Sequence, residues 1–172
     1  MLQLPEKIEK VIKQEQLLKN FVDKTYTHKD MFFIGRGLDY AASMEGSLKL
    51  KEVSYIHSDA YAGGELKHGP IALIEDGTVV IALATQDALF EKMLSNIKEI
   101  KSRGANVLAI AKEGNTSIEQ SVDSVLYIPK TLDILTPVLS VILLQILAYH
   151  MAIKKGCDVD KPRNLAKSVT VE

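Results

Sequence analysis

Four short apolar runs constrain the fold of this chain more than any other feature of its sequence. They are Met31–Ile34, Thr78–Ala84, Val107–Ala111 and Val125–Ile128. Strands of a parallel sheet have this continuous apolar character, because helices cover both faces of the sheet. The segments between the runs have helical spacing or turn residues. The sequence therefore predicts one doubly wound α/β domain, with a parallel sheet between helices.

Apolar residues three and four positions apart predict the covering helices. Leu4–Tyr26 is interpreted as one helix, Asp39–Val53 as a second and Ala88–Arg103 as a third. The polar stretch Tyr55–Pro70, with its paired glycines, is interpreted as a loop that forms a site, followed by a short helical turn.

The segment Leu135–Ile153 requires a choice between a membrane span and a buried helix. It is almost entirely apolar and nearly long enough to cross a bilayer. Its polar interruptions, among them Gln145 and His150, favour a buried helix. A helix that is apolar on every side needs cover beyond its own sheet, and we expect a partner domain or subunit to provide it.

Composition narrows the classes of function. With 172 residues and a formal net charge of −1, the chain is the size of one domain and has no basic excess to attract nucleic acid. A single cysteine, Cys157, allows no internal disulfide, which fits a reducing compartment. The first residues alternate charged and apolar side chains, so no secretory signal is expected. We therefore expect a cytoplasmic protein that binds neither nucleic acid nor membrane.

Gly35-Arg36-Gly37 follows the first strand, at the position where open α/β sheets bind ligands. A dinucleotide fingerprint needs a small residue at position 40, where this chain has Tyr40, and Asp59 alone is weak support for a ribose contact. The glycines are interpreted as a tight turn, with or without an anion at the helix start.

The helix after this turn carries a carboxylate and an amine one turn apart. One stripe of this helix consists of Ala41, Met44, Leu48 and Glu52. Glu52 therefore continues an apolar face, where burial would raise its proton affinity. Lys49 can reach Glu52 across one turn, which favours the charged carboxylate. The arrangement fits a tuned acid–base pair or a surface ladder, because Glu45 lies four positions before Lys49, and spacing alone favours the ladder.

Two further side chains have reactive chemistry and an open role. His68 lies in a glycine-flanked loop, where it is either a proton donor and acceptor or a turn residue. Lys167, near the end of the chain, is flanked by the small residues Ala166 and Ser168, which would let its amine approach a carbonyl. A frayed tail is the simpler interpretation of this segment. The histidines have no metal-ligand spacing, so no metal site is predicted.

Four runs of the sequence resemble one known family. They are Phe33–Gly37, Glu45–Ile56, Gly64–Ile74 and Pro162–Glu172. They are similar to the second sugar isomerase (SIS) domain of the glucosamine-6-phosphate synthases, also called glutamine–fructose-6-phosphate aminotransferases. The resemblance covers nearly the whole chain. It implies that residues 1–172 form a single three-layer, flavodoxin-like SIS domain of a longer enzyme.

The resemblance implies a role for each candidate residue. Lys167 would form a Schiff base with open-chain fructose 6-phosphate, and His68 would assist ring opening from a neighbouring subunit. Glu52 would move a proton between C1 and C2, and Lys49 would assist at the C1 hydroxyl. Ala166 would contact the sugar through its backbone. An iminium withdraws electrons, so this ketose–aldose isomerisation to glucosamine 6-phosphate requires no cofactor.

The same resemblance implies what this chain would need from elsewhere. A glutaminase domain would supply ammonia, a first SIS domain would supply the phosphate loop, and a homodimer would complete the site. The isolated chain is therefore expected to be nearly inactive. Two alternatives remain open, namely a non-catalytic regulatory module that binds sugar phosphates and a structural dimerisation domain built around Leu135–Ile153.

Overall fold

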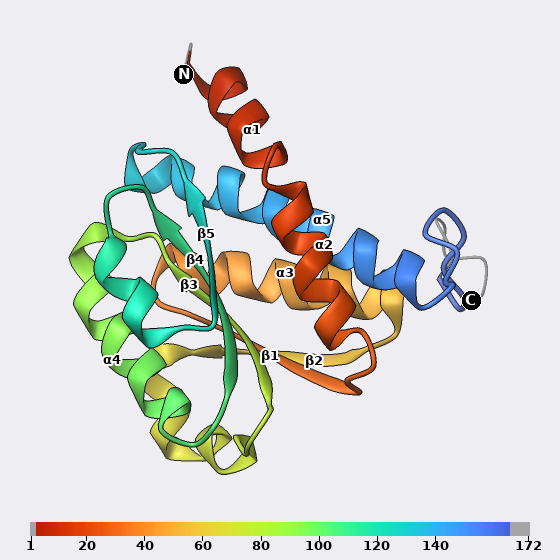
Figure 1. Cartoon of the computed structure of the whole chain (residues 1–172), viewed down its shortest axis with the longest axis horizontal. Coiled ribbons are helices and arrows are strands. Elements are labelled where there is room, and N and C mark those ends of the chain that lie inside the picture. The colour runs from red at the N-terminus through yellow and green to blue at the C-terminus, as the bar shows by residue number, and fades with distance from the viewer. Residues whose placement is uncertain (1–2, 166–172) are drawn as a thin grey trace, which may run out of the picture.

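The computed structural model describes residues 3–165, and its centre is a five-stranded parallel sheet (Figure 1). The strands are β1 (Asp30–Gly35), β2 (His57–Ala62), β3 (Val79–Ala84), β4 (Asn106–Lys112) and β5 (Ser124–Ile128). Their order is β2-β1-β3-β4-β5, and every neighbouring pair is parallel. This is the flavodoxin-like order, with a switch point between β1 and β3. The predicted doubly wound α/β fold is confirmed.

Helices cover both faces of the sheet and give three layers (Figure 1). One face carries α1 (Leu4–Ile12), α2 (Glu15–Thr25), α3 (Leu38–Ser54) and α5 (Thr136–Lys154). The other carries α4 (Phe90–Lys101) together with the 3-10 helices η1 (Gly63–His68), η2 (Pro70–Leu73) and η4 (Thr116–Ser121). β1 shows why the strands are apolar on both sides. Met31 and Phe33 are buried under the first layer, whereas Phe32 and Ile34 are buried under the second.

The prediction of a loop over Tyr55–Pro70 is wrong for its first half, which forms the edge strand β2. The buried residue Ser58 on this strand is hydrogen-bonded to Ser47 of α3. Its hydroxyl donates to the Ser47 carbonyl at 2.9 Å, and the Ser47 hydroxyl donates to the Ser58 carbonyl at 2.9 Å. An edge strand held in this way needs no apolar run, so hydrophobic periodicity could not reveal it.

The single helix predicted over Leu4–Tyr26 is two helices, α1 and α2, with a break at Lys13 and Gln14. At the break the Gln14 side chain pairs with the backbone of the edge strand β5. Its amide nitrogen donates to the Tyr127 carbonyl at 2.7 Å, and its oxygen accepts from the Tyr127 N–H at 3.0 Å. Gln14 thereby satisfies two backbone groups that an edge strand would leave open. Apolar spacing continues across the break, which is why it predicts one helix.

Small residues on α3 let this helix lie close to both α5 and the sheet. A Cβ added at Gly46 would lie 2.6 Å from a side-chain carbon of Leu144 and 3.1 Å from the Phe33 ring. Ser43 and Ser47 on the same face are at most 2% exposed. The packing face of α3 is therefore made mostly of small residues, with Leu50 as a buried large apolar residue, whereas Met44 and Leu48 lie outside this face.

The apolar segment Asp133–Lys154 is long enough to cross a membrane by length and composition alone. In the structure α5 packs in the helix layer against α3, α2 and α1. Leu143 and Leu147 on its inner face are buried, as predicted for a core helix. Tyr149 and Ile153 on its outer face remain about half exposed, at 48% and 51%.

Candidate functional site

Lys49 and Glu52 form an ion pair near the end of α3. Lys49 Nζ lies 2.5 Å from Glu52 Oε2 and 3.8 Å from Glu45 Oε1. The Lys49 and Glu52 side chains are 31% and 29% exposed, so the pair is partly shielded from water and remains accessible to a ligand. The Glu45 contact is the predicted surface ladder. Lys49 therefore forms ion pairs with two carboxylates, and the one with Glu52 is much shorter.

The hydrogen bond with Glu52 fixes the charge of Lys49. It is the largest cause that raises the pKa of Lys49 above its ordinary value of 10.5, and the negative charges of Glu52 and Glu45 add to it against the effect of burial. The amine therefore stays protonated near neutral pH. Protonated Lys49 can donate a hydrogen bond, but it has no lone pair with which to attack a carbonyl.

The helix stripe that ends in Glu52 faces outward, so the interpretation that it forms a buried apolar face is wrong. Met44 and Leu48 on this stripe are 46% and 45% exposed. The opposite face packs inside because its glycine and serines allow close approach to α5 and the sheet. Glu52 therefore lies at the end of an exposed apolar stripe and not among core side chains.

An open pocket of about 480 Å³ lies beside Glu52. Its other lining residues are Lys51, Tyr55, Ile56, His57, Arg163, Asn164 and Leu165. Because α3 joins the end of β1 to the start of the parallel strand β2, its last turn lies where the strands begin. We call this side of the sheet the amino edge. Ligands of α/β sheets usually bind at the opposite side, the carboxyl edge.

The pocket joins the end of α3 to the carboxyl-terminal part of the chain. Arg163 and Leu165 line it from that segment, and Figure 1 shows the segment next to the ends of α3 and α5. Ala166 and Lys167 lie outside the described residues, so their predicted contacts remain predictions.

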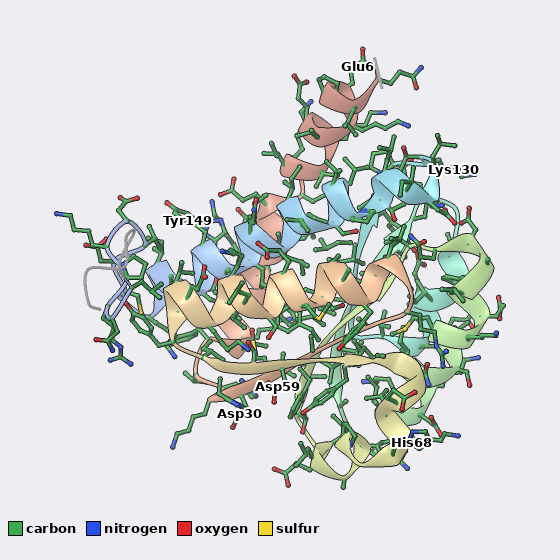
Figure 2. All side chains as sticks on the ribbon, turned by 180° about the vertical axis from the view of Figure 1, so that it is seen from behind. Glu6, Asp30, Asp59, His68, Lys130 and Tyr149 are labelled. Carbon is green, nitrogen blue, oxygen red and sulfur yellow. The ribbon has the colours of Figure 1, made fainter. Side chains whose placement is uncertain are left out.

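His68 lies at the carboxyl edge, away from Glu52. It ends η1, the short helix that follows β2, and Figure 2 shows it on the opposite side of the molecule from the carboxyl-terminal segment. Its side chain is 73% exposed, and its Nδ1 lies 2.7 Å from Glu65 Oε2. The structure therefore brings Lys49 and Glu52 together and leaves His68 apart. Within one chain, His68 and Glu52 cannot act on the same sugar.

The carboxyl edge holds a polar cluster that sequence analysis missed. Asp39, in the first turn of α3, is 2% exposed and accepts hydrogen bonds from the Thr85 hydroxyl and, at 2.7 Å, from the Thr85 backbone N–H. Burial raises the pKa of Asp39 above its ordinary value of 3.8, and the hydrogen bonds from Thr85 and Gln86 oppose this effect. The predicted tight turn precedes it, since a Cβ on Gly35 would lie 2.5 Å from the Asp39 carbonyl carbon.

A buried lysine completes this cluster. Lys112 ends β4 with a side chain that is 5% exposed, and its Nζ lies 2.8 Å from Asp87 Oδ2 and 2.6 Å from Asp133 Oδ1. Burial alone would lower the pKa of Lys112, but the hydrogen bonds with Asp133 and Asp87 more than reverse this, so the pKa is raised. The buried charges of this cluster therefore have their hydrogen-bond and ion-pair partners within the chain. The position of Lys112, directly after the apolar run Val107–Ala111, is the sequence signal that could have revealed it.

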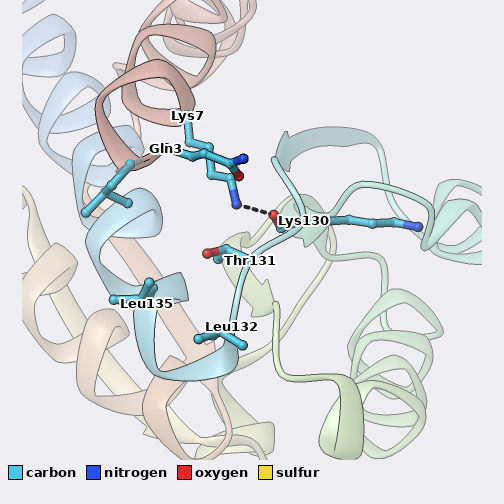
Figure 3. Close-up of a pocket in the computed structure, with 7 residues that line it drawn as sticks. Gln3, Lys7, Lys130, Thr131, Leu132 and Leu135 are labelled. Carbon is cyan, nitrogen blue, oxygen red and sulfur yellow. Dashed lines mark hydrogen bonds between the residues drawn. The ribbon is translucent and has the colours of Figure 1, made fainter. Parts of the chain in front are cut away.

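A second hollow, about 660 Å³ in volume, lies between α1 and the loop before α5 (Figure 3). It is lined by Gln3, Leu4, Lys7, Lys130, Thr131, Leu132 and Leu135. Lys7 Nζ donates to the Lys130 carbonyl at 2.6 Å, which connects its two sides. Its described lining contains no carboxylate or histidine and so offers no acid–base pair. Within residues 3–165, no three His, Cys, Asp or Glu side chains gather in a way that would hold a metal ion.

Known proteins resemble this chain over its whole length. Glutamine–fructose-6-phosphate aminotransferase (isomerizing) from Clostridium acetobutylicum is 64% identical over 100% of the chain. The protein of the same name from Thermus thermophilus is 48% identical, also over 100% of the chain. This chain spans 28% of the length of each of these relatives.

Solved structures agree with these relatives. The C-terminal domain of glucosamine-fructose-6-phosphate aminotransferase from Francisella tularensis superimposes with a TM-score of 0.83 at 37% identity, covering 90% of this chain and 43% of that one. Glucosamine-6-phosphate deaminase from Thermotoga maritima gives a TM-score of 0.76 at 29% identity, covering 98% of this chain and 50% of that one. The sequence profile of the SIS domain family matches residues 25–155. The resemblance proposed from the sequence is confirmed, and this chain belongs to the SIS domain family.

Proposed function

We propose that this chain supplies part of the isomerase site of a glutamine–fructose-6-phosphate aminotransferase, which makes glucosamine 6-phosphate from fructose 6-phosphate and ammonia. The observation that carries the proposal is the pocket in which Glu52, bonded to Lys49, faces the segment that leads to Lys167. The relatives named above support the assignment by their names. The role of residues 1–172 as the second SIS domain of a longer enzyme is part of the same proposal.

The proposed chemistry uses this chain's own side chains. The Lys167 amine attacks C2 of the open-chain ketone, and water leaves as the iminium forms. Ammonia then replaces the lysine at C2. Glu52 removes a proton from C1 and returns it to C2, while protonated Lys49 donates a hydrogen bond to the C1 oxygen. As C1 becomes the aldehyde, its hydroxyl proton passes to solvent and the amine at C2 takes up one proton, so the step balances. Ala166 contacts the sugar through its backbone.

His68 takes part in this proposal as a residue from a second chain. Its exposed position at the carboxyl edge supports ring opening in a neighbouring subunit, because it cannot reach Glu52 of its own chain. The site is therefore proposed to be complete only in a homodimer that also contains the first SIS domain and the glutaminase domain. A cytoplasmic location also remains a prediction.

Borohydride trapping tests the proposal. This chain replaces the matching segment of the Clostridium acetobutylicum relative, and the chimeric enzyme is incubated with fructose 6-phosphate and borohydride. Mass spectrometry should find one reduced sugar adduct, on Lys167, which Lys167→Arg abolishes. The matched control is Lys161→Arg, which changes an exposed lysine of the same segment and should leave the adduct intact.

Other outcomes separate the alternatives. Binding of fructose 6-phosphate without any adduct would favour a non-catalytic, regulatory sugar-phosphate module. An adduct on another lysine would contradict the assignment of Lys167. Polar substitution of exposed α5 residues such as Ile153 tests the third alternative. If dimer formation is lost while sugar binding is unchanged, α5 has a dimerisation role.

A further inference from the structure

Only two non-glycine residues within the described chain, residues 3–165, have a positive φ, and both line the pocket beside Glu52. They are Tyr55, with a φ of 60°, and Asn164, with a φ of 62°. A left-handed backbone is disfavoured for residues with a Cβ, especially for one as bulky as tyrosine. Such conformations persist where surrounding contacts hold them, and they gather at functional sites. The contacts of Tyr55 therefore need an explanation.

Tyr55 holds the carboxyl-terminal segment by two contacts. Its hydroxyl oxygen accepts a hydrogen bond from the Arg163 backbone N–H at 2.8 Å. The Arg163 guanidinium carbon lies 4.1 Å from the centre of the Tyr55 ring, where the negative face of the ring attracts the cation. Tyr55 belongs to neither of the two apolar clusters that stabilise the sheet. Its contacts with Arg163 thus serve the carboxyl-terminal segment and not the core.

The same segment is attached to α3 before it reaches Tyr55. Cys157 Sγ lies 3.9 Å from the Ser54 carbonyl oxygen, at the end of α3. The Asp158 carboxylate accepts hydrogen bonds from the N–H groups of Asp160 and Lys161, at 2.9 and 3.0 Å. These bonds form a turn between the two attachment points. Attachment at residues 157 and 163 fixes the direction in which the chain approaches the pocket.

We propose that Tyr55 and Arg163 form a clamp that positions Lys167 beside Glu52, an inference that rests on the function proposed above. Glu52 lies three residues before Tyr55, a rise of about 4.5 Å along the helix. Leu165 lines the same pocket, and two residues beyond it reach at most about 7 Å. With Arg163 held, Leu165, from which the chain continues towards Lys167, stays at the pocket that Glu52 lines. Tyr55 and Arg163 are positioning residues.

A clamp of this kind affects the rate of the reaction more than the affinity for the sugar. Imine formation requires the amine to lie within about 3.5 Å of the carbonyl carbon, and a misplacement of about 1 Å can cost about 100-fold in rate. Binding of the sugar phosphate to other groups does not depend on where this amine lies. Loss of the clamp should therefore lower kcat and leave KM nearly unchanged.

The experiment compares clamp variants in the chimeric enzyme described above. Tyr55→Leu removes both contacts, whereas Tyr55→Phe removes only the hydroxyl. We expect Tyr55→Leu to lower kcat and the rate of adduct formation on Lys167 by about 10- to 100-fold, and KM to change by less than about threefold. Tyr55→Phe should show a smaller loss. The matched control is Tyr26→Leu, a tyrosine whose ring also faces a cation, Lys154 Nζ at 5.4 Å, but which lies outside this pocket; it should behave like the parent.

Hydrogen exchange gives a readout that does not depend on activity. The Arg163 amide should exchange about tenfold faster or more in Tyr55→Phe, because its acceptor is gone. Tyr55→Phe and Arg163→Gln test the clamp even where Tyr55→Leu does not fold. The clamp would be overturned if hydrogen exchange and adduct trapping were unchanged in both variants. In that case an adduct on Lys167 of the parent enzyme would still support the proposed function. Absence of a Lys167 adduct in the parent would instead overturn the proposed function, and with it the role of the clamp in positioning this amine.

Discussion

The two edges of the sheet hold their charges in opposite ways. At the carboxyl edge, Asp39 and Lys112 are almost fully buried; Asp39 accepts hydrogen bonds from Thr85, and Lys112 forms ion pairs with Asp87 and Asp133. At the amino edge, Lys49 and Glu52 are paired but each is about a third exposed, beside an open pocket. A buried, paired charge cannot exchange its partner for a ligand without a large desolvation cost, whereas a partly exposed pair can.

This difference indicates which edge of the sheet carries the accessible acid–base pair. The carboxyl edge is the usual ligand position of α/β sheets. In this chain, Asp39 and Lys112 with their partners occupy this edge near the switch point between β1 and β3. Strained backbone lies at the other edge, at Tyr55 and Asn164. We therefore place the chemistry at the amino edge, where α3 ends and the carboxyl-terminal segment arrives. Four predictions test this difference between the two edges.

Glu52→Gln should have the largest effect. Without a carboxylate to move the proton, isomerisation by the chimeric enzyme should fall by about 100- to 10,000-fold. Glu45→Gln is the matched control, because Glu45 lies on the same helix and contacts the same lysine at 3.8 Å. Its activity should stay within about threefold of the parent. Conversion of fructose 6-phosphate measures both, and equal losses in the two variants would place the proton transfer elsewhere.

Mixing of subunits tests whether one site combines the amino edge of one chain, with Glu52, and the carboxyl edge of its partner chain, with His68. Glu52→Gln and His68→Asn should each be inactive alone, but co-expression should restore about a quarter of parental activity, since half of the dimers are mixed and each mixed dimer has one intact site. Glu52→Gln with Lys167→Arg should restore nothing, because both residues are proposed to act from the same chain. Restoration in both mixtures, or in neither, would contradict the shared site.

Asp39→Ala should affect stability instead of chemistry. It leaves the buried Thr85 N–H and hydroxyl without their acceptor, so the free energy of unfolding of this chain should fall by about 2 kcal/mol. Urea unfolding followed by circular dichroism measures the loss. A change below about 0.5 kcal/mol would mean that this cluster does not brace the carboxyl edge.

The pH dependence of Asp39→Asn should show the smallest effect. Burial raises the pKa of Asp39, so between the ordinary pKa and the raised one the folded state holds the proton more tightly than the unfolded state. The parent chain therefore loses stability as pH rises through this window. The introduced amide does not titrate, so Asp39→Asn should gain stability relative to the parent as pH rises from the ordinary pKa through the raised one, with no further gain above this window. Urea midpoints at several pH values measure this, and an opposite slope would contradict the raised pKa.

Sequence patterns predicted the elements that large apolar residues define. The strands β1, β3, β4 and β5 and the helix α5 all bury such residues on the sheet. The patterns failed where hydrogen bonds replaced apolar contacts. Ser58 holds the edge strand β2 through Ser47, and Gln14 ends a helix by pairing with β5.

The candidate site was predictable in part. The spacing of Lys49 and Glu52 predicts their contact, and the structure shows it at 2.5 Å. The outward direction of their stripe was not predictable, because the buried face of α3 consists mostly of serines and Gly46, and Leu50 is its one large apolar residue. The Tyr55 contact with Arg163 joins residues 108 positions apart, and only the folded chain brings them together.

A crystal structure of the chimeric enzyme, with fructose 6-phosphate reduced onto it by borohydride, tests the central claim most directly. The account predicts that sugar C2 is bonded to Lys167 Nζ at the amino edge, with a Glu52 carboxylate oxygen within about 3.5 Å of C1 or C2. Sugar density at the carboxyl edge beside Asp39 and Lys112, with Glu52 remote from it, would contradict the account.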